Sequence, residues 1–260
     1  MYYYIYDSFL TDRKYERVLA AIETRLTDLG IAGKIGRLTP FTNARGLVRD
    51  ETRRGVKTIV VVGNDETVAQ VVGGIGDASV TLGIIPVGSP ANIAQSLGIP
   101  CGAEACDVLS RRVTQQIDLG QINGQYFLSE VRLPPGKFTV EGEGKFRISS
   151  LVDDSEIVIS NLRGIDTAVA GGAVFNDPGD PQDGNLDVLI VPRQGRMMKA
   201  LKGGAASSTV IPLRKLTVSS DRPFAVSVDG RKTSYNNAVI EIAPGRLKVI
   251  TGKERLFAAG

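Results

Sequence analysis

The first 112 residues alternate between strand patterns and helix patterns. Unbroken apolar or β-branched runs predict buried strands, and the segment 15–29 carries apolar side chains at the spacing of a helix. The predicted strands, in chain order, are Tyr2–Tyr6, Lys34–Arg37, Thr58–Val62 and Thr81–Ile85, and the predicted helices are 15–29, Asn43–Arg54, one that starts at Thr67–Val72, Ala91–Leu97 and Asp107–Arg111. Strands that alternate with helices predict a parallel sheet covered by helices.

After about residue 113 the pattern changes to short β-rich runs separated by turns. Asn123-Gly124 predicts a two-residue hairpin between strands at Gln116–Ile122 and Gln125–Arg132, because both residues tolerate positive φ. Further strands are predicted at Glu156–Ser160, Leu186–Val191, Leu216–Ser219, Phe224–Val228, Ala238–Ile242 and Leu247–Thr251. We therefore expect an α/β domain with a parallel sheet over residues 1–112 and an antiparallel β-sandwich domain over residues 113–260.

The composition excludes several kinds of chemistry. The 260 residues include no histidine, which excludes Ser-His-Asp and Cys-His catalysis and leaves proton transfer to Asp, Glu, Lys or Tyr. Cys101 and Cys106 do not form the four-ligand pattern of a zinc site. A net charge of +3 does not indicate a nucleic-acid partner. The sequence shows neither a signal peptide nor a run of about 20 apolar residues, which favours a cytoplasmic protein, peripheral at a membrane at most.

Two polar turns follow the two most apolar predicted strands. The first is the segment Gly63–Thr67, with the sequence Gly-Asn-Asp-Glu-Thr, and the second is Pro86–Ser89, with the sequence Pro-Val-Gly-Ser. Parallel strands bind ligands beyond their carboxyl ends, where backbone amides and helix N-termini attract anions. We therefore expect a phosphate site there. The alternative is two ordinary turns, in which Thr67 caps one helix and Ser89 caps the next, with Pro90 in its first turn.

These turns, followed by Ala-x-x-Leu-Gly-Ile-Pro at residues 94–100, resemble in their order the catalytic domain of diacylglycerol kinases and related lipid kinases. The resemblance continues at residues 183–188 (Asp-Gly-Asn-Leu-Asp-Val) and 228–230 (Val-Asp-Gly), so it covers most of the chain. It implies transfer of the γ-phosphate of ATP, with Mg²⁺, to the hydroxyl of a lipid such as diacylglycerol. The nucleotide-binding residues that it implies are Thr39, Gly63, Asn64, Asp65, Glu66, Thr67, Gly88 and Ser89.

The resemblance also assigns chemistry to the second half, where the lipid is expected to bind. It implies that Asp229 is the catalytic base and that Asp180, Asp183 and the Asn185 carbonyl hold a magnesium ion, since Mg²⁺ prefers oxygen ligands. The residues alone also permit an Asp-Gly hairpin turn at Asp229 and an Asx turn at residues 180–185. The basic and apolar segment Arg193–Lys202 is either a surface for an anionic bilayer or an ordinary solvated helix.

The sequence departs from the family pattern at several positions. Asn64 and Glu66 replace glycines of the usual Gly-Gly-Asp-Gly-Thr, Pro90 removes an amide, and Arg231 stands where the family has glutamate. The expected Asn-Pro-x-x-Gly after the first strand is replaced by a segment that begins with Asp7. A catalytically degenerate nucleotide- or lipid-binding relative is therefore one alternative, and an NAD kinase-like enzyme is another. The sequence is compatible with a homodimer.

Overall fold

A computed structural model of the chain describes residues 1–39, 42, 44–76, 78–136, 138–143, 146–149, 155–162, 167–168, 174–175, 179–192 and 209–257. The chain forms two compact units, Met1–Ile117 with Gly245–Gly260, and Asp118–Pro244. The first unit includes the end of the chain, which the predicted boundary near residue 112 assigned to the second domain. The basic segment Arg193–Lys202 lies outside the described residues.

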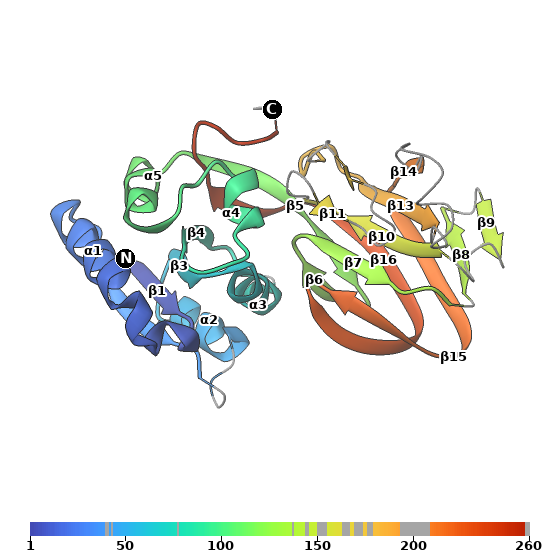
Figure 1. Cartoon of the computed structure of the whole chain (residues 1–260), viewed down its shortest axis with the longest axis horizontal. Coiled ribbons are helices and arrows are strands. Elements are labelled where there is room, and N and C mark those ends of the chain that lie inside the picture. Colours follow the sequence, from blue (N-terminus) through green and yellow to red (C-terminus); the bar gives the residue numbers. More distant parts are fainter. Residues whose placement is uncertain are drawn as a thin grey trace, which may run out of the picture. The chain divides into compact units, whose positions relative to one another are not determined.

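The first unit is built on a parallel sheet, as the sequence predicted (Figure 1). Its strand order is β2 (Lys34–Arg37), β1 (Tyr2–Tyr6), β3 (Thr58–Gly63), β4 (Thr81–Pro86) and the last residues of β16 (Arg231–Ile250). All neighbours on this path are parallel. Both β3 and β4 are buried along their whole length, which explains why neither strand alternates apolar and polar residues.

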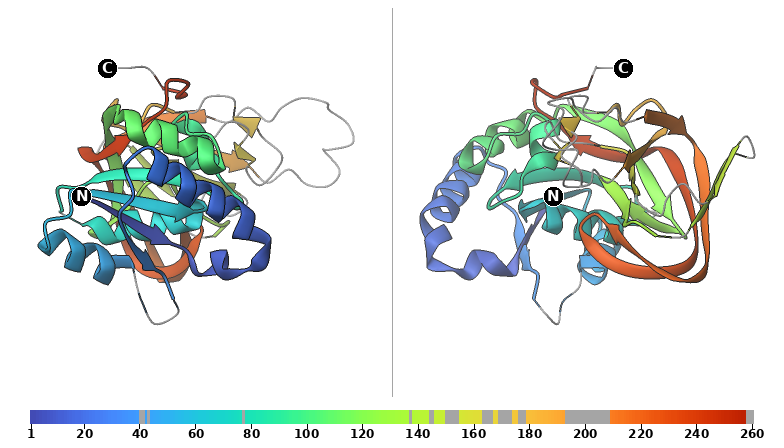
Figure 2. Two further views of the ribbon diagram at one scale, coloured as in Figure 1. Left: turned by 90° about the vertical axis from the view of Figure 1, so that its left-hand side faces the viewer. Right: turned by 45° about the vertical axis from the view of Figure 1, so that its right-hand side comes forward.

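Helices cover both faces of this sheet (Figures 1 and 2). They are α1 (Glu16–Asp28), α2 (Ala44–Arg53), α3 (Asp65–Ile75), α4 (Asn92–Ser96) and α5 (Ala105–Arg111), with short 3-10 helices at Ser8–Thr11, Arg13–Tyr15 and Gly102–Glu104. Thr67 takes part in the cap of α3, as the sequence allowed, because its hydroxyl accepts a hydrogen bond from the Asn64 amide, whereas the predicted cap of α4 was wrong. Asn64 precedes α3 and accepts a hydrogen bond from the amide of Thr67, so the helix begins at Asp65. Ala91, and not Ser89, precedes α4.

The second unit is an antiparallel β structure. Its strands are β5 (Thr114–Ile122), β6 (Gln125–Phe127), β7 (Glu130–Leu133), β8 (Thr139–Gly142), β9 (Phe146–Ser149), β10 (Ser155–Ser160), β11 (Thr167–Ala168), β12 (Val174–Phe175), β13 (Leu186–Pro192), β14 (Thr209–Leu213), β15 (Lys215–Val228) and the first part of β16. The main path runs β14-β13-β10-β7-β15-β16, and each neighbouring pair is antiparallel. This arrangement confirms the predicted antiparallel class.

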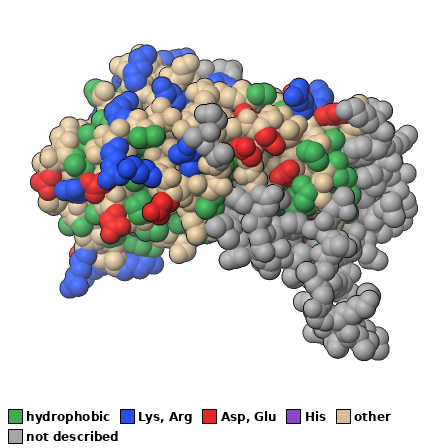
Figure 3. All heavy atoms as spheres, turned by 90° about the horizontal axis from the view of Figure 1, so that it is seen from above, with side chains coloured by type: hydrophobic (Ala, Val, Ile, Leu, Met, Phe, Trp, Pro, Cys, Tyr) green, Lys and Arg blue, Asp and Glu red, His purple; other side chains and the backbone are tan. Residues whose placement is uncertain are grey.

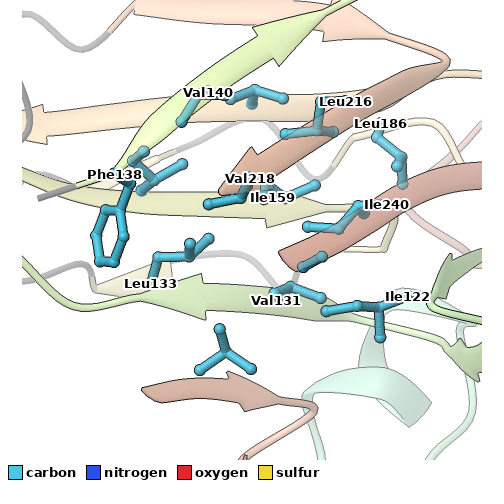
Figure 4. Close-up of a cluster of buried hydrophobic side chains, with 14 of the residues drawn as sticks. Ile122, Val131, Leu133, Phe138, Val140, Ile159, Leu186, Leu216, Val218 and Ile240 are labelled. Carbon is cyan, nitrogen blue, oxygen red and sulfur yellow. The ribbon is translucent and has the colours of Figure 1, made fainter. Parts of the chain in front are cut away.

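Alternate residues of these strands form one apolar core (Figure 4). Val131 and Leu133 of β7 point into it together with Ile159 of β10 and Ile240 of β16, and all four are buried. The intervening residues of β7 are charged, which is the period-two pattern of a strand with one face on a core.

Two hairpin turns in this unit have the same backbone geometry. Asn123-Gly124 joins β5 to β6 with φ values of 46° and 83°, and Asp229-Gly230 joins β15 to β16 with 45° and 81°. Two successive residues of positive φ match the right-handed twist of the flanking strands. The first turn was predicted. The strand predicted at Gln125–Arg132 is divided into β6 and β7, because the chain turns at Leu128 and Ser129.

Candidate functional site

The two polar turns predicted to bind phosphate are joined to each other at the carboxyl ends of β3 and β4. The amide of Val87 donates to the Gly63 carbonyl at 3.0 Å, and the amide of Asp65 donates to the Pro90 carbonyl at 2.9 Å. The side-chain amide of Asn64 adds a bond of 3.2 Å to the Ser89 carbonyl. The turns after β3 and β4 therefore form one structural element within the first unit.

The carboxylate of Asp65 lies at the N-terminus of α4. It accepts hydrogen bonds from the amides of Asn92 at 2.8 Å and Ile93 at 3.1 Å, and α4 has no cap from the residue that precedes it. Burial raises the pKa of Asp65, and the two amides act in the opposite direction by stabilising the charged form. Asp65 therefore fixes the second turn from the first, and the predicted contact of Asp65 with the nucleotide stays a prediction.

Thr67 is fully buried, and its hydroxyl is used within the protein. The hydroxyl accepts a bond from the Asn64 amide at 3.2 Å and donates to the Asp7 carboxylate at 2.7 Å. A Cβ on Gly63 would lie 2.8 Å from the Thr67 Cβ, so glycine is required by this packing. The sequence interpretation did not assign Asp7 to the site. Its position directly after β1, which pairs with β3, is the signal that would have found it.

Four backbone amides at this edge have no acceptor within the described part of the chain. They belong to Glu66, Gly88, Ser89 and Ala91. Glu66 is in the first turn of α3 with an exposed side chain, so its carboxylate lies in solvent. Gly88 has a φ of 84°, and a Cβ there would lie 3.1 Å from the Phe9 ring. Unpaired amides beside a helix N-terminus are the groups that bind phosphate oxygens.

Thr39 lies farther from these turns along the sheet edge. It follows β2, which is separated from β3 by β1, and its hydroxyl donates to the Thr42 hydroxyl at 2.9 Å. Its predicted contact with the nucleotide remains a prediction.

Asp229 occupies the β15–β16 turn with its carboxylate directed at the backbone of the β6–β7 connection. One carboxylate oxygen accepts from the amides of Ser129 at 2.8 Å and Glu130 at 2.9 Å, and the other accepts from Leu128 at 2.8 Å. The amide of Asp229 donates back to the Glu130 carbonyl at 2.9 Å. Burial is the main cause that raises the pKa of Asp229, to about 6, with a smaller contribution from the charge of Glu130, while the three amides lower it. The hairpin turn weighed from the sequence is present, and the catalytic assignment stays a prediction.

The loop at residues 180–185 contains the Asx turns that the sequence allowed. The Gln182 amide donates to the Asp180 carboxylate at 3.0 Å, and the Asn185 amide donates to the Asp183 carboxylate at 2.8 Å. In the described ranges, no group of three Cys, Asp or Glu side chains is arranged for a metal ion. Both carboxylates nonetheless belong to one short loop, and metal binding there stays a prediction.

Asp118 on β5 is a further polar residue that the sequence interpretation missed. It is 3% exposed, its carboxylate accepts from the Gly184 amide at 2.9 Å, and its own amide donates to the Pro181 carbonyl at 2.7 Å. A buried acid in a strand must be hydrogen-bonded, and this one holds the 180–185 loop. The signal in the sequence was an aspartate between the apolar residues Ile117 and Leu119.

Comparison with known proteins shows similarity to lipid kinases. Residues 2–122 match the family model for the diacylglycerol kinase catalytic domain. The diacylglycerol kinase of Bacillus subtilis is 32% identical over 119 residues, which cover 44% of this chain and 39% of that protein. The “Probable lipid kinase YegS-like” of Pseudomonas aeruginosa is 25% identical over 246 residues, which cover 80% of each chain. These similarities support a member of the diacylglycerol kinase-like family of lipid kinases.

A solved structure supports the fold over almost the whole chain. The crystal structure of a diacylglycerol kinase from Bacillus anthracis superposes with a TM-score of 0.77 and 19% identity, and it covers 97% of each chain. Among the described residues of this chain, no helix has the length and apolar character needed to cross a bilayer. On the face that Figure 3 shows, basic and acidic side chains are interspersed.

Proposed function

We propose that this protein transfers the γ-phosphate of ATP to the hydroxyl of a lipid, diacylglycerol or a related alcohol. The observation that carries the proposal is the joined pair of turns at the carboxyl edge of β3 and β4, where four amides have no acceptor among the residues that the structure describes. That arrangement offers hydrogen-bond donors to a polyphosphate where open parallel sheets bind their ligands. The family of named lipid kinases supports the same reaction class.

Asp229 is the residue that we propose as the base. In the transfer, the lipid hydroxyl oxygen bonds to the γ-phosphorus, the bond to the ADP oxygen breaks, and the hydroxyl proton passes to the carboxylate. The oxygen that bonds only to Leu128 retains a lone pair for that proton, whereas the other oxygen already accepts two amides. A pKa of about 6 leaves Asp229 mainly ionised at neutral pH.

The residues at the 180–185 loop fit a magnesium ion by their chemistry. Asp180, Asp183 and the Asn185 carbonyl would provide oxygen ligands, and Asp118 holds the same loop through its bond from the Gly184 amide. When bound, Mg²⁺ would supply positive charge and fix this loop. Because the acceptor is a lipid, we propose that the protein works in the cytoplasm at the surface of a membrane, without spanning it.

A second candidate function is binding without turnover. It is favoured by the engagement of Asp65 and Thr67 in bonds within the protein, and by the presence of Arg231 in place of the family glutamate. In that case, side chains that the family resemblance assigns to the nucleotide are already engaged in hydrogen bonds that stabilise the fold.

A turnover assay separates the two candidates. Purified protein is incubated with ATP, Mg²⁺ and a panel of lipid alcohols in mixed micelles, with NAD as an additional acceptor. Kinase activity predicts phosphorylated lipid, and it predicts a loss of at least about a hundredfold in Asp229→Asn, since general-base catalysis contributes that much. Asp221→Asn, an exposed acid of the same strand β15, is the matched control and should stay active. ATP binding by calorimetry without turnover on any acceptor would favour the binding protein, and phosphorylation of NAD alone would favour the NAD kinase-like alternative.

A further inference from the structure

Asn161 follows β10 and is 3% exposed. Its backbone amide donates to the Ser129 carbonyl at 2.8 Å. Its side-chain amide donates to two further carbonyls, Leu128 at 3.0 Å and Asp118 at 2.9 Å. Only the NH₂ group can face two carbonyl oxygens, because a side-chain oxygen there would repel both, so the orientation of the amide is fixed by its neighbours.

The peptide groups that Asn161 holds are those that bind Asp229. Leu128 and Ser129 each give their carbonyl to Asn161 and their amide to the Asp229 carboxylate. The β6–β7 connection is therefore fixed from two sides, by an asparagine and by an aspartate that is 68 residues later in the chain. This explains why β6 and β7 are separate strands, since these amides turn away from the ladder.

We infer that Asn161 is a positioning residue for Asp229, acting through the β6–β7 connection, and that Asp118 ties the same side chain to the 180–185 loop. The inference rests on the proposed function for its catalytic meaning, whereas its structural part stands without it. Asn161 has no contact of its own with a substrate in this proposal. It keeps three amides directed at one carboxylate, and so it sets the direction in which the remaining lone pair of Asp229 points.

The buried oxygen of the Asn161 side chain indicates that this residue serves more than core packing. Within the described part of the chain this oxygen has no hydrogen-bond partner. An unsatisfied buried acceptor costs stability, so a residue selected for the core alone would be apolar. The two donors of the amide are what the position requires, and leucine or aspartate could not supply them.

Other charges near Asp229 do not depend on Asn161. Glu130 of β7 faces Asp229, and Arg132 pairs with Glu130 and lies 3.5 Å from the Glu156 carboxylate of β10. Arg231 follows on the same hairpin with an exposed side chain. Asn161→Ala adds no charge and leaves all of these groups in place, so a change in the titration of Asp229 reports the burial of its carboxylate or the geometry of the three amides, and not a new charge.

Amide NMR of the full chain tests the structural part of the inference. In the wild type, the amide shifts of Leu128, Ser129 and Glu130 should titrate with one common midpoint near the Asp229 pKa of about 6, and Asp229→Asn should abolish this titration. Asn161→Ala should remove the common midpoint, and Asn161→Ser, which keeps one donor, should restore part of it. Asn236→Ala, an exposed asparagine of β16, should behave as the wild type.

The kinetic part uses the same variants with ATP and lipid. Asn161→Ala should lower kcat at least tenfold and shift the midpoint of the pH–kcat profile, while the KM for ATP stays within about twofold. If the three amides do not share a midpoint in the wild type, or keep it in a folded Asn161→Ala, the inference is overturned. If Asn161→Ala does not fold, Asn161→Ser and the wild-type titration still decide it. A wild type that shows the common titration but phosphorylates no lipid would refute the proposed function and leave the structural part intact.

Discussion

Gly63→Ala tests whether the first turn is packed as the structure shows. The new Cβ would lie 2.8 Å from the Thr67 Cβ and 3.0 Å from its Cγ2, and closer still to its hydroxyl. Such separations are shorter than van der Waals contact, and both residues are fully buried, so the Thr67 side chain must move. Gly63 lies in a strand and not in the left-handed region, so the substitution acts through this contact alone.

The cost follows from what Thr67 would lose. Its hydroxyl accepts from the Asn64 amide in the cap of α3, which is worth about 1 kcal/mol, and it donates to the Asp7 carboxylate, which is worth about 1.5–3 kcal/mol. Some of this is recovered by relaxation, so we expect Gly63→Ala to lower the free energy of unfolding by about 3 kcal/mol.

Urea unfolding followed by circular dichroism measures this change. Thr67→Ala, which already gives up the cap and the Asp7 bond, provides the background for a double-mutant cycle. We expect Gly63→Ala to cost at least about 1 kcal/mol less in that background than alone. A cost below about 0.5 kcal/mol in the wild type, or strict additivity of the two substitutions, would refute the packing argument.

Three further predictions concern charged groups. Because the pKa of Asp229 is about 6 in the folded chain and its ordinary value is 3.8, the folded state binds more protons between these values, and this contribution to stability is lost as pH rises from about 4 to 6. Asp229→Asn should therefore remove a pH-dependent loss of about 1–2 kcal/mol in urea titrations over that range, and an unchanged pH slope would count against the burial of Asp229. Replacement of Lys34 and Arg54 together by Met leaves the buried Glu51 carboxylate without its two ion pairs of 2.6 Å, and it should lower the free energy of unfolding by about 3 kcal/mol at pH 7. Arg49→Met, which breaks an exposed pair, is the control and should lower it by less than about 0.5 kcal/mol. Asp65→Ala removes the acceptor for two α4 amides and should lower the free energy of unfolding, measured by thermal unfolding, by about 2 kcal/mol. Asp65→Asn keeps a neutral acceptor and should lower it by about 1 kcal/mol, so equal effects of the two variants would contradict a charged cap.

The features that could be predicted from the sequence are local ones. The runs that became β3 and β4 are buried on both faces, so their composition alone identified them. Asn123-Gly124 formed the predicted hairpin because both residues adopt positive φ at low cost. In each case the cause lies within a few residues of the effect.

The features that the sequence could not reveal are contacts between distant segments. Asp65 caps a helix 27 residues later, the Thr67 hydroxyl bonds to Asp7 across 60 residues, and Asp229 accepts from Leu128 across 101 residues. Each of these aspartates satisfies backbone amides or a hydroxyl outside its own turn. A short motif shows that a polar residue is present, but it does not show which partner that residue has.

The departures from the family loop are linked by these same contacts. Asn64, in place of glycine, caps α3 and holds the Ser89 carbonyl, so its side chain stabilises both turns. The Asp7 carboxylate accepts a hydrogen bond from the Thr67 hydroxyl, and this bond keeps the Thr67 side chain packed on Gly63. Glu66, an acid within the proposed phosphate loop, has an exposed side chain, and its backbone amide has no acceptor within the described residues. These side chains therefore stabilise the backbone of the loop. Backbone amides, which no side-chain replacement other than proline removes, are the groups through which a loop of this kind would hold a polyphosphate.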